Sequence, residues 1–167
     1  MQDSTSSSSA ADQQAEKHPL PHPRRPSWWQ TFWDKTGSYI SVALGSMVGA
    51  VARFLVSVLC VSQFGDRFPW GTLFVNVTGS FMIGFYAALT GPDGRLLVSA
   101  RQRLFVMVGF CGGYTTFSAF SLETLRLVQS GNVQTALVYL FVSAITWITS
   151  AWIGHALATR INRLRGT

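Results

Sequence analysis

Uncharged hydrogen-bond donors recur at one-turn spacing inside long apolar stretches of this sequence. Thr72, Asn76 and Ser80 are four residues apart, and a second set at about the same spacing consists of Tyr139, Ser143, Thr146 and Ser150. Residues three or four apart share one face of a helix, so each set predicts a polar stripe. Such stripes either join neighbouring helices or line a path for a polar species. An amide such as Asn76 favours the second role, because in hydrocarbon it needs a partner or water.

The segment Gly109 to Ser121, which reads GFCGGYTTFSAFS, predicts an interruption in a helix. Glycine and β-branched threonine both lower helix propensity, so we expect a break near Gly112 to Thr116. Irregular backbone inside a membrane must be satisfied by protein, water or an ion, and free carbonyls are able to hold a cation. After the break, Phe117 and Phe120 project toward one face, either as core packing or as part of the same site.

Four apolar stretches must position these residues. The chain has 167 residues, of which 48% are hydrophobic and only 12% charged, whereas soluble domains carry about 25% charged residues. About 20 apolar residues cross the hydrocarbon core as a helix. The stretches run near Tyr39 to Val61, Trp70 to Leu89, Leu104 to Val128 and Val133 to Ala158. We predict an all-α integral membrane protein with four transmembrane helices, the third of them broken in mid-membrane.

The two ends of the chain differ from this core. Residues 1–36 contain a serine run, prolines and charges, which predict a disordered tail. Its end carries Trp28, Trp29 and Trp33 beside basic residues, a composition typical of a segment at the lipid headgroups. The four-helix transmembrane domain is expected over residues 37–160, followed by a short basic tail over 161–167.

The net charge of +6 does not indicate a nucleic-acid partner, because the basic residues flank the apolar stretches. Most of them precede the first span, lie between the second and third, or follow the fourth, and only Arg67 and Arg126 belong to the other side. The positive-inside rule therefore predicts both termini in the cytoplasm. The expected surroundings are a lipid bilayer.

Two other classes of membrane protein fit poorly. No nucleophile with a neighbouring base and no metal-ligand set occurs in the spans, so an enzyme is not predicted. A small proton-coupled exporter needs a carboxylate in mid-membrane, but Glu123, the only acid in a span, lies toward the end of the third. Cys60 and Cys111 lack metal-ligand spacing and are expected to be packing residues.

Three segments of the sequence resemble a known family of membrane proteins. The runs GSMVGAVARF (Gly45 to Phe54), GTLFVNVTGSF (Gly71 to Phe81) and GFCGGYTTFSAFSLE (Gly109 to Glu123) look like the signature segments of the Fluc, or CrcB, fluoride channels. The resemblance covers all four spans. It implies passive, fluoride-selective export that relieves cytoplasmic fluoride toxicity. It further implies an antiparallel, dual-topology dimer with two narrow pores and a structural Na⁺ at the centre of the interface.

The resemblance also implies roles for single residues. Asn76 matches the pore amide, and the carbonyls of Gly112 and Thr115 match the Na⁺ ligands. Arg53 and Glu123 match positions of the vestibule. The other positions matched to the fluoride pore are Thr72, Phe117, Phe120, Ser121, Tyr139 and Ser143.

These residue types suit a small, strongly hydrated anion. Amide and hydroxyl donors replace water without fixed positive charge, and ring edges carry the positive part of the aromatic quadrupole. Two features depart from the family. Trp147 stands one turn after Ser143, where a small polar residue is expected. The loop charges also favour one side, so either the basic residues of the tail count little in a homodimer, or the chain pairs with an oppositely oriented paralogue.

Overall fold

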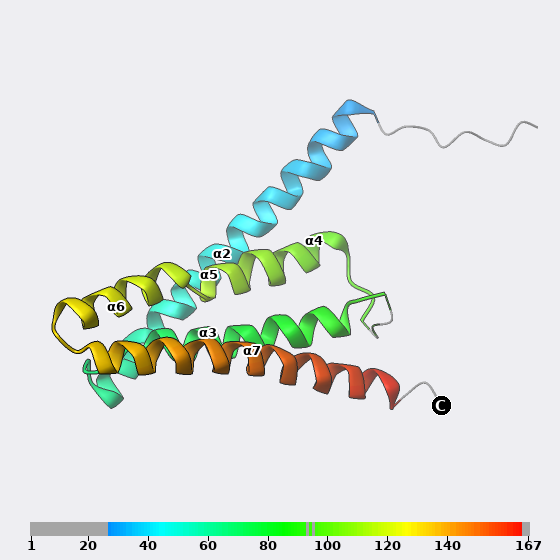
Figure 1. The fold of residues 1–167 in the computed structure, drawn as a ribbon. Coiled ribbons are helices and arrows are strands. Elements are labelled where there is room, and N and C mark those ends of the chain that lie inside the picture. The colour runs from blue at the N-terminus through cyan, green and yellow to red at the C-terminus, as the bar shows by residue number, and fades with distance from the viewer. Residues whose placement is uncertain (1–26, 93, 95, 165–167) are drawn as a thin grey trace, which may run out of the picture. The chain divides into compact units, whose positions relative to one another are not determined.

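Helices joined by loops make up the part of the chain that the structure, a computed structural model, describes: residues 27–92, 94 and 96–164. Its elements are α2 (Trp28–Phe64), α3 (Trp70–Leu89), α4 (Ala100–Arg103), η1 (Leu104–Cys111), α5 (Gly112–Tyr114), α6 (Phe117–Gln129) and α7 (Val133–Arg163). Four segments are long and apolar enough to span a membrane: Lys35–Phe64, Trp70–Leu89, Ala100–Gln129 and Val133–Arg163. The predicted four-span architecture is confirmed (Figure 1).

The chain divides into two units, Met1–Asp34 and Lys35–Thr167. In the first unit, helix is present from Trp28, about a dozen residues before the first predicted span. Trp28 and Trp29 stack with ring centroids 4.1 Å apart, and Phe32 and Trp33 meet edge to face. The disorder predicted for residues 1–36 falls largely on residues 1–26, which lie outside the described residues, as do residues 165–167 of the predicted basic tail.

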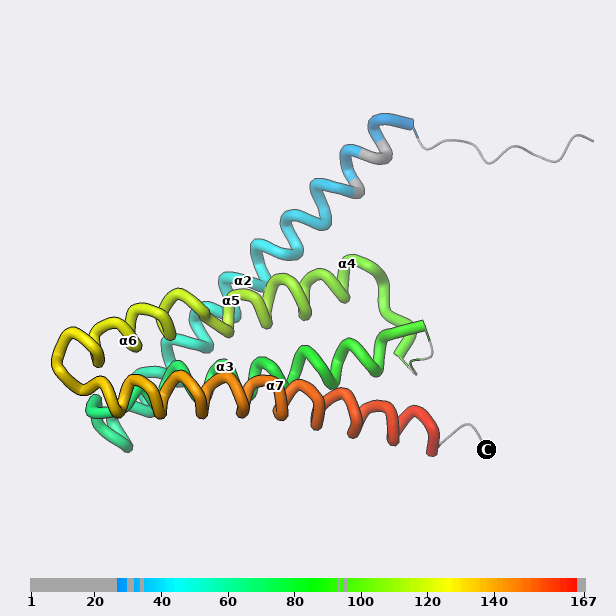
Figure 2. Tube along the Cα trace, in the orientation of Figure 1, coloured from blue at the N-terminus to red at the C-terminus, as the bar shows by residue number. Residues whose placement is uncertain are grey.

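Helices α3 and α7 form the most extensive pair in the second unit and run side by side in Figures 1 and 2. Glycines bring their backbones into direct contact. A Cβ at Gly84 would fall on the carbonyl oxygen of Ala151, and a Cβ at Gly154 on that of Phe81. Small residues are the usual means of close approach between helices in lipid. Across this pair, the Ser150 hydroxyl of α7 donates to the Val77 carbonyl oxygen of α3 at 2.7 Å.

Helix α2 packs against the third span through a second set of glycines. A Cβ at Gly45 would lie 2.5 Å from the Phe105 carbonyl oxygen, and one at Gly49 would fall on that of Phe110. From the opposite side, a Cβ at Gly109 would lie 3.0 Å from Gly45 Cα. The first and third of the sequence motifs, which contain these glycines, therefore also include the places where the backbones of α2 and the third span come into contact.

The third span consists of several pieces rather than one helix. After α4 the chain forms the π-helix η1, continues as the short α5, and then becomes extended at Thr115 (φ −83°, ψ 158°) and Thr116 (φ −153°, ψ 121°). Helix α6 begins at Phe117, capped by the Thr116 side chain, which accepts a hydrogen bond from the Ala119 N–H. The predicted break is confirmed and falls on the two threonines, whereas the π-helix was not predicted.

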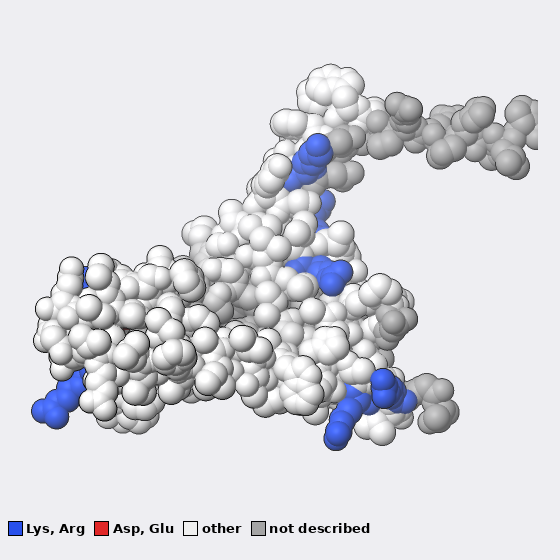
Figure 3. All heavy atoms as spheres, in the orientation of Figure 1, with Lys and Arg blue, Asp and Glu red and all other residues white. Residues whose placement is uncertain are grey.

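The surface of the bundle is apolar, as expected for a protein surrounded by lipid. Large side chains on α2 and α7 point outward, among them Phe54, Phe141, Ile145 and Ile148, which are 60–73% exposed. On the face drawn in Figure 3, Lys and Arg side chains lie toward the ends of the bundle, and the surface between them is uncharged. This distribution matches a hydrocarbon layer bounded by two polar interfaces.

Candidate functional site

Asn76 holds the break in the third span together. Its amide Nδ2 donates to the Thr116 carbonyl oxygen at 2.9 Å, and its Oδ1 accepts from the Thr116 N–H at 2.8 Å. The side chain is 5% exposed, so both backbone groups would otherwise be buried without partners. An amide has two N–H donors, and this arrangement uses one of them for the backbone. Asn76 therefore supports the fold and still has an N–H for a ligand.

The same contacts release two backbone carbonyls. In a continuous helix the N–H groups of Thr116 and Ala119 would bond to the carbonyls of Gly112 and Thr115, four residues earlier. Here they donate to Asn76 Oδ1 and to the Thr116 hydroxyl instead. Gly112 and Thr115 are the residues to which the sequence resemblance assigned the Na⁺ ligands. Their carbonyl oxygens are hard donors of the kind that suits such a cation.

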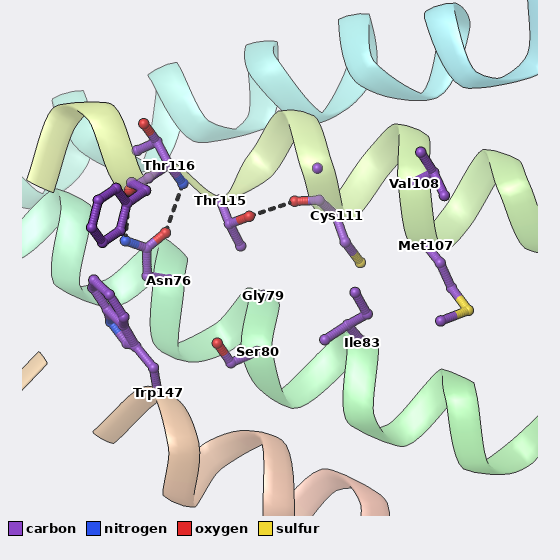
Figure 4. A pocket seen from close by; sticks show the side chains of 12 residues that line it. Asn76, Gly79, Ser80, Ile83, Met107, Val108, Cys111, Thr115, Thr116 and Trp147 are labelled. Atoms are coloured by element: carbon purple, nitrogen blue, oxygen red, sulfur yellow. Dashed lines mark hydrogen bonds between the residues drawn. The ribbon is translucent and has the colours of Figure 1, made fainter. Parts of the chain in front are cut away.

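A cavity of about 460 Å³ opens beside the break, and we call it the central cavity. Asn76, Gly79 and Ser80 of α3 form one wall, Cys111 and Thr116 belong to the opposite side, and Trp147 closes it from α7 (Figure 4). The remaining lining residues are Ile83, Met107, Val108, Gly112, Thr115 and Phe117. Most of this wall is apolar. The polar groups gather at Asn76 and the two threonines.

A group of aromatic rings packs next to the central cavity. Phe120 is 8% exposed, and its ring centroid lies 5.1 Å from that of Tyr139 and 4.8 Å from that of Trp147. The Trp147 ring meets Phe120 at an interplanar angle of 73°, an edge-to-face arrangement. Phe117 is 5.6 Å from Phe120 but is 72% exposed. The two phenylalanines are thus neighbours, one inside the subunit and one on its surface.

The Glu123 carboxylate accepts hydrogen bonds from two hydroxyl groups near the aromatic rings. Glu123 Oε1 accepts from the Thr72 hydroxyl at 2.7 Å, and Oε2 accepts from the Tyr139 hydroxyl at 2.8 Å. The hydroxyl hydrogens of Thr72 and Tyr139 are therefore engaged by Glu123 in this structure. Sequence spacing gave no indication of this triad, because its three members come from three different spans.

Glu123 and Thr72 also line a second cavity of about 500 Å³, here called the mouth cavity. It lies where α3 and α6 meet the loop after α2, and Asp66, Arg67 and Arg126 bring charge to it. Thr72 in the mouth cavity and Asn76 in the central cavity are one turn apart on α3, a rise of about 6 Å. The buried cluster of Leu73, Phe120 and Tyr139 lies next to both cavities, because it packs against Trp147 of the central cavity and against Phe68 and Leu127 of the mouth cavity.

Two buried donors on α7 have no partner among the described residues. Ser143 Oγ, in a side chain with 0% exposure, makes no hydrogen bond, and neither does the Trp147 indole N–H. An unsatisfied buried donor costs about 1–3 kcal/mol. Ser143 was predicted as a site residue, whereas Trp147 was noted only as a departure from the expected pattern.

Two predicted residues lie apart from this group. Ser121 is exposed, and its hydroxyl donates to the Phe117 carbonyl oxygen of its own helix at 3.0 Å. Arg53 is half-buried on α2 and lines neither cavity. The structure thus brings together Thr72, Asn76, Phe120, Glu123, Tyr139 and Ser143, with Phe117 at the edge of the group.

Four spans, a broken third helix and buried neutral donors between two cavities define a multi-pass membrane protein with a polar site in its interior. Among the described residues, no three His, Cys, Asp or Glu side chains are grouped as metal ligands. A family model described as CrcB-like protein, Camphor Resistance (CrcB), matches residues 40–155. The chain belongs to this CrcB family.

Several named proteins are similar to the chain over the same region. The chain is 58% identical over 134 residues to the fluoride-specific ion channel FluC 1 of Rhodopseudomonas palustris, covering 80% of this chain and 95% of that protein. It is 53% identical over 133 residues to FluC 1 of Bradyrhizobium diazoefficiens, with 80% and 92% covered. It is 45% identical over 128 residues to FluC of Methylocella silvestris, with 77% and 98% covered. These relatives are named as ion channels and not as enzymes.

Proposed function

We propose that this chain is a fluoride channel of the bacterial plasma membrane, through which F⁻ leaves the cytoplasm down its gradient. The observation that carries the proposal is a set of uncharged donors at and near the two cavities: the Asn76 amide, the Ser143 hydroxyl, and the Thr72 and Tyr139 hydroxyls held by Glu123. The names of relatives at 45–58% identity support fluoride as the ion.

Fluoride loses its water between the mouth cavity and the central cavity. The free Ser143 hydroxyl and the second Asn76 N–H replace part of that water with donors that carry no charge. Phe120 offers an apolar wall with electropositive ring edges, which a small anion tolerates better than a large one. Several weak binding sites, one after another along the path, allow the ion to leave as readily as it arrives.

Glu123 orders the mouth of this path. Its carboxylate holds the Thr72 and Tyr139 hydroxyls in one arrangement while no anion is near. The Thr72 and Tyr139 hydroxyls turn by rotation about one bond, so an anion at the mouth competes with the carboxylate for their hydrogens. The triad thus supplies donors without a rearrangement of the helices.

A sodium ion fits the break in the third span. The carbonyls of Gly112 and Thr115 lack the N–H partners of a continuous helix, which supports them as its ligands. When bound, Na⁺ supplies fixed positive potential close to the central cavity.

Reconstitution in liposomes tests the proposed function. Vesicles loaded with potassium fluoride and containing the purified chain are expected to release fluoride when valinomycin carries K⁺ outward. A fluoride electrode records the release, and parallel vesicles loaded with potassium chloride are expected to retain their anion. Equal release of both halides, or no release of fluoride, contradicts the proposal.

The functional unit is a dimer of oppositely oriented subunits. Phe117 lines the central cavity but is 72% exposed, so a single chain leaves this wall uncovered. A second copy, or a paralogue, completes it. Numbered names such as FluC 1 and FluC 3 among the relatives support more than one such chain per organism.

The orientation of the chain decides between these two partners. Arg103 and Arg163 line one cavity at one end of the bundle, whereas Arg67 and Arg126 line the mouth cavity at the other. Because Arg101 and Arg160 lie within one turn of these two residues and add to the first end, we expect the chain expressed alone to insert with both termini in the cytoplasm. Accessibility of a terminal cysteine tag to an impermeant reagent measures this. A near-even split between sides would instead support a homodimer and exclude the need for a paralogue.

A further inference from the structure

Trp147 carries one of three buried side-chain polar atoms that have no hydrogen-bond partner in the described part of the chain. Its indole nitrogen is buried and has no hydrogen-bond partner. Indole nitrogen is only a donor, so no neighbouring donor satisfies it. Buried tryptophan N–H groups normally find an acceptor. An acceptor that is not part of this chain is therefore needed at this position.

The position of the ring is fixed by its neighbours. Trp147 meets Phe120 edge to face at 4.8 Å and belongs to the shell around the buried cluster of Leu73, Phe120 and Tyr139. It also lines the central cavity, as Asn76 does (Figure 4). A ring held in this way keeps its N–H in place.

Helical spacing links this donor to the others of α7. Tyr139, Ser143 and Trp147 are each four residues apart and share one face of the helix. Tyr139 and Ser143 are fully buried, and the side chain of the latter also lacks a partner. Trp147 therefore extends the series of donors by one turn, from the mouth toward the central cavity.

We propose that the Trp147 indole N–H binds the permeating anion together with Ser143 Oγ and the second N–H of Asn76, so that Trp147 determines affinity and selectivity. The inference rests on the proposed fluoride path. The ring takes the place of a smaller polar side chain, supplies a donor, and narrows the passage beside Phe120. Small anions are accepted by the donors, and larger ones meet the ring.

Direct observation of the indole provides the first test. The full chain, labelled with ¹⁵N-tryptophan and held in nanodiscs, is titrated with sodium fluoride and, separately, with sodium chloride. The Trp147 indole resonance is assigned as the signal that disappears in Trp147→Phe. A shift of this signal that saturates with fluoride and is absent with chloride is expected. An unchanged Trp147 signal in fluoride overturns the proposal.

Transport provides the second test. Trp147→Phe keeps an aromatic ring and removes the N–H, and we expect fluoride efflux from liposomes to fall about tenfold or more, because a hydrogen bond to a charged group is lost. Trp152→Phe is the matched control, since Trp152 is 69% exposed on the same helix and its variant is expected to transport normally. Both variants are first checked for a monodisperse elution profile.

The outcomes separate this inference from the proposed function. Normal or faster fluoride efflux through Trp147→Phe means that the ring only packs or obstructs, and it overturns the inference while the channel function stands. Absence of efflux through the unaltered chain contradicts the channel function itself. If Trp147→Phe does not fold, Trp147→His retains a ring N–H and is expected to recover efflux. The indole signal that is missing in Trp147→His then assigns the Trp147 resonance, so the spectroscopic titration of the unaltered chain still decides.

Discussion

Replacement of Asn76 by aspartate is expected to abolish fluoride efflux. Asn76→Asp places a carboxylate where the amide N–H faces the path. For two charges about 4 Å apart at an effective dielectric constant of about 20, the repulsion is about 4 kcal/mol. A barrier raised by that amount slows passage by roughly a thousandfold. The measurement is fluoride efflux from liposomes at neutral pH.

The structure adds a second effect of the same change. Aspartate cannot donate to the Thr116 carbonyl, which Asn76 Nδ2 now reaches at 2.9 Å. A buried carbonyl without its donor costs about 1–3 kcal/mol, so thermal stability in detergent should decrease moderately. Asn132→Asp makes the same chemical change at the exposed start of α7 and should affect neither property. Near-normal efflux through Asn76→Asp would remove Asn76 from the path.

Truncation of Phe120 to alanine is expected to damage both stability and selectivity. The ring is buried against Tyr139 and Trp147, in a cluster that also packs against Phe68 and Leu127 of the mouth cavity. Its loss leaves a void and costs about 3–5 kcal/mol of stability. The void also joins the mouth cavity to the central cavity, so chloride should begin to leak. Chloride efflux from liposomes and the midpoint of thermal aggregation are the two measurements.

Two further variants show whether this effect belongs to the ring. Phe120→Leu keeps most of the volume, so it should recover most of the stability and block chloride again. Phe141→Ala removes a ring that is 60% exposed on the lipid side and should leave selectivity intact. Full retention of chloride by Phe120→Ala would show that another residue forms the barrier.

Local patterns in the sequence were sufficient to predict the four membrane-spanning helices and the break in the third of them. Apolar length predicted the four helices, and the low helix propensity of glycine and threonine placed the interruption within a few residues of Thr115 and Thr116. The π-helix Leu104–Cys111 was not predicted, because its apolar residues carry no signal that distinguishes it from an α-helix.

Contacts between distant residues could not be predicted in the same way. Asn76 and Thr116 are 40 positions apart, and nothing in the spacing of either indicates a pair of mutual hydrogen bonds. The binding of Thr72 and Tyr139 to Glu123 likewise depends on how three spans pack. In the sequence, Trp147 departs from the expected series of small polar residues because its side chain is large. Only the packed structure reveals that its indole N–H is buried without a partner.

The spacing of Thr72 and Asn76 has an electrical consequence. These residues belong to cavities of about 500 and 460 Å³, and a single helical turn lies between them. Where electrolyte fills both cavities, and the mouth cavity is open to one solution and the central cavity to the other, most of the membrane voltage falls across that one turn rather than across the full bilayer. A monovalent ion there gains nearly the whole of about 2.3 kcal/mol per 100 mV. Current through the protein should therefore respond to voltage mainly at the step that passes the Phe120 ring.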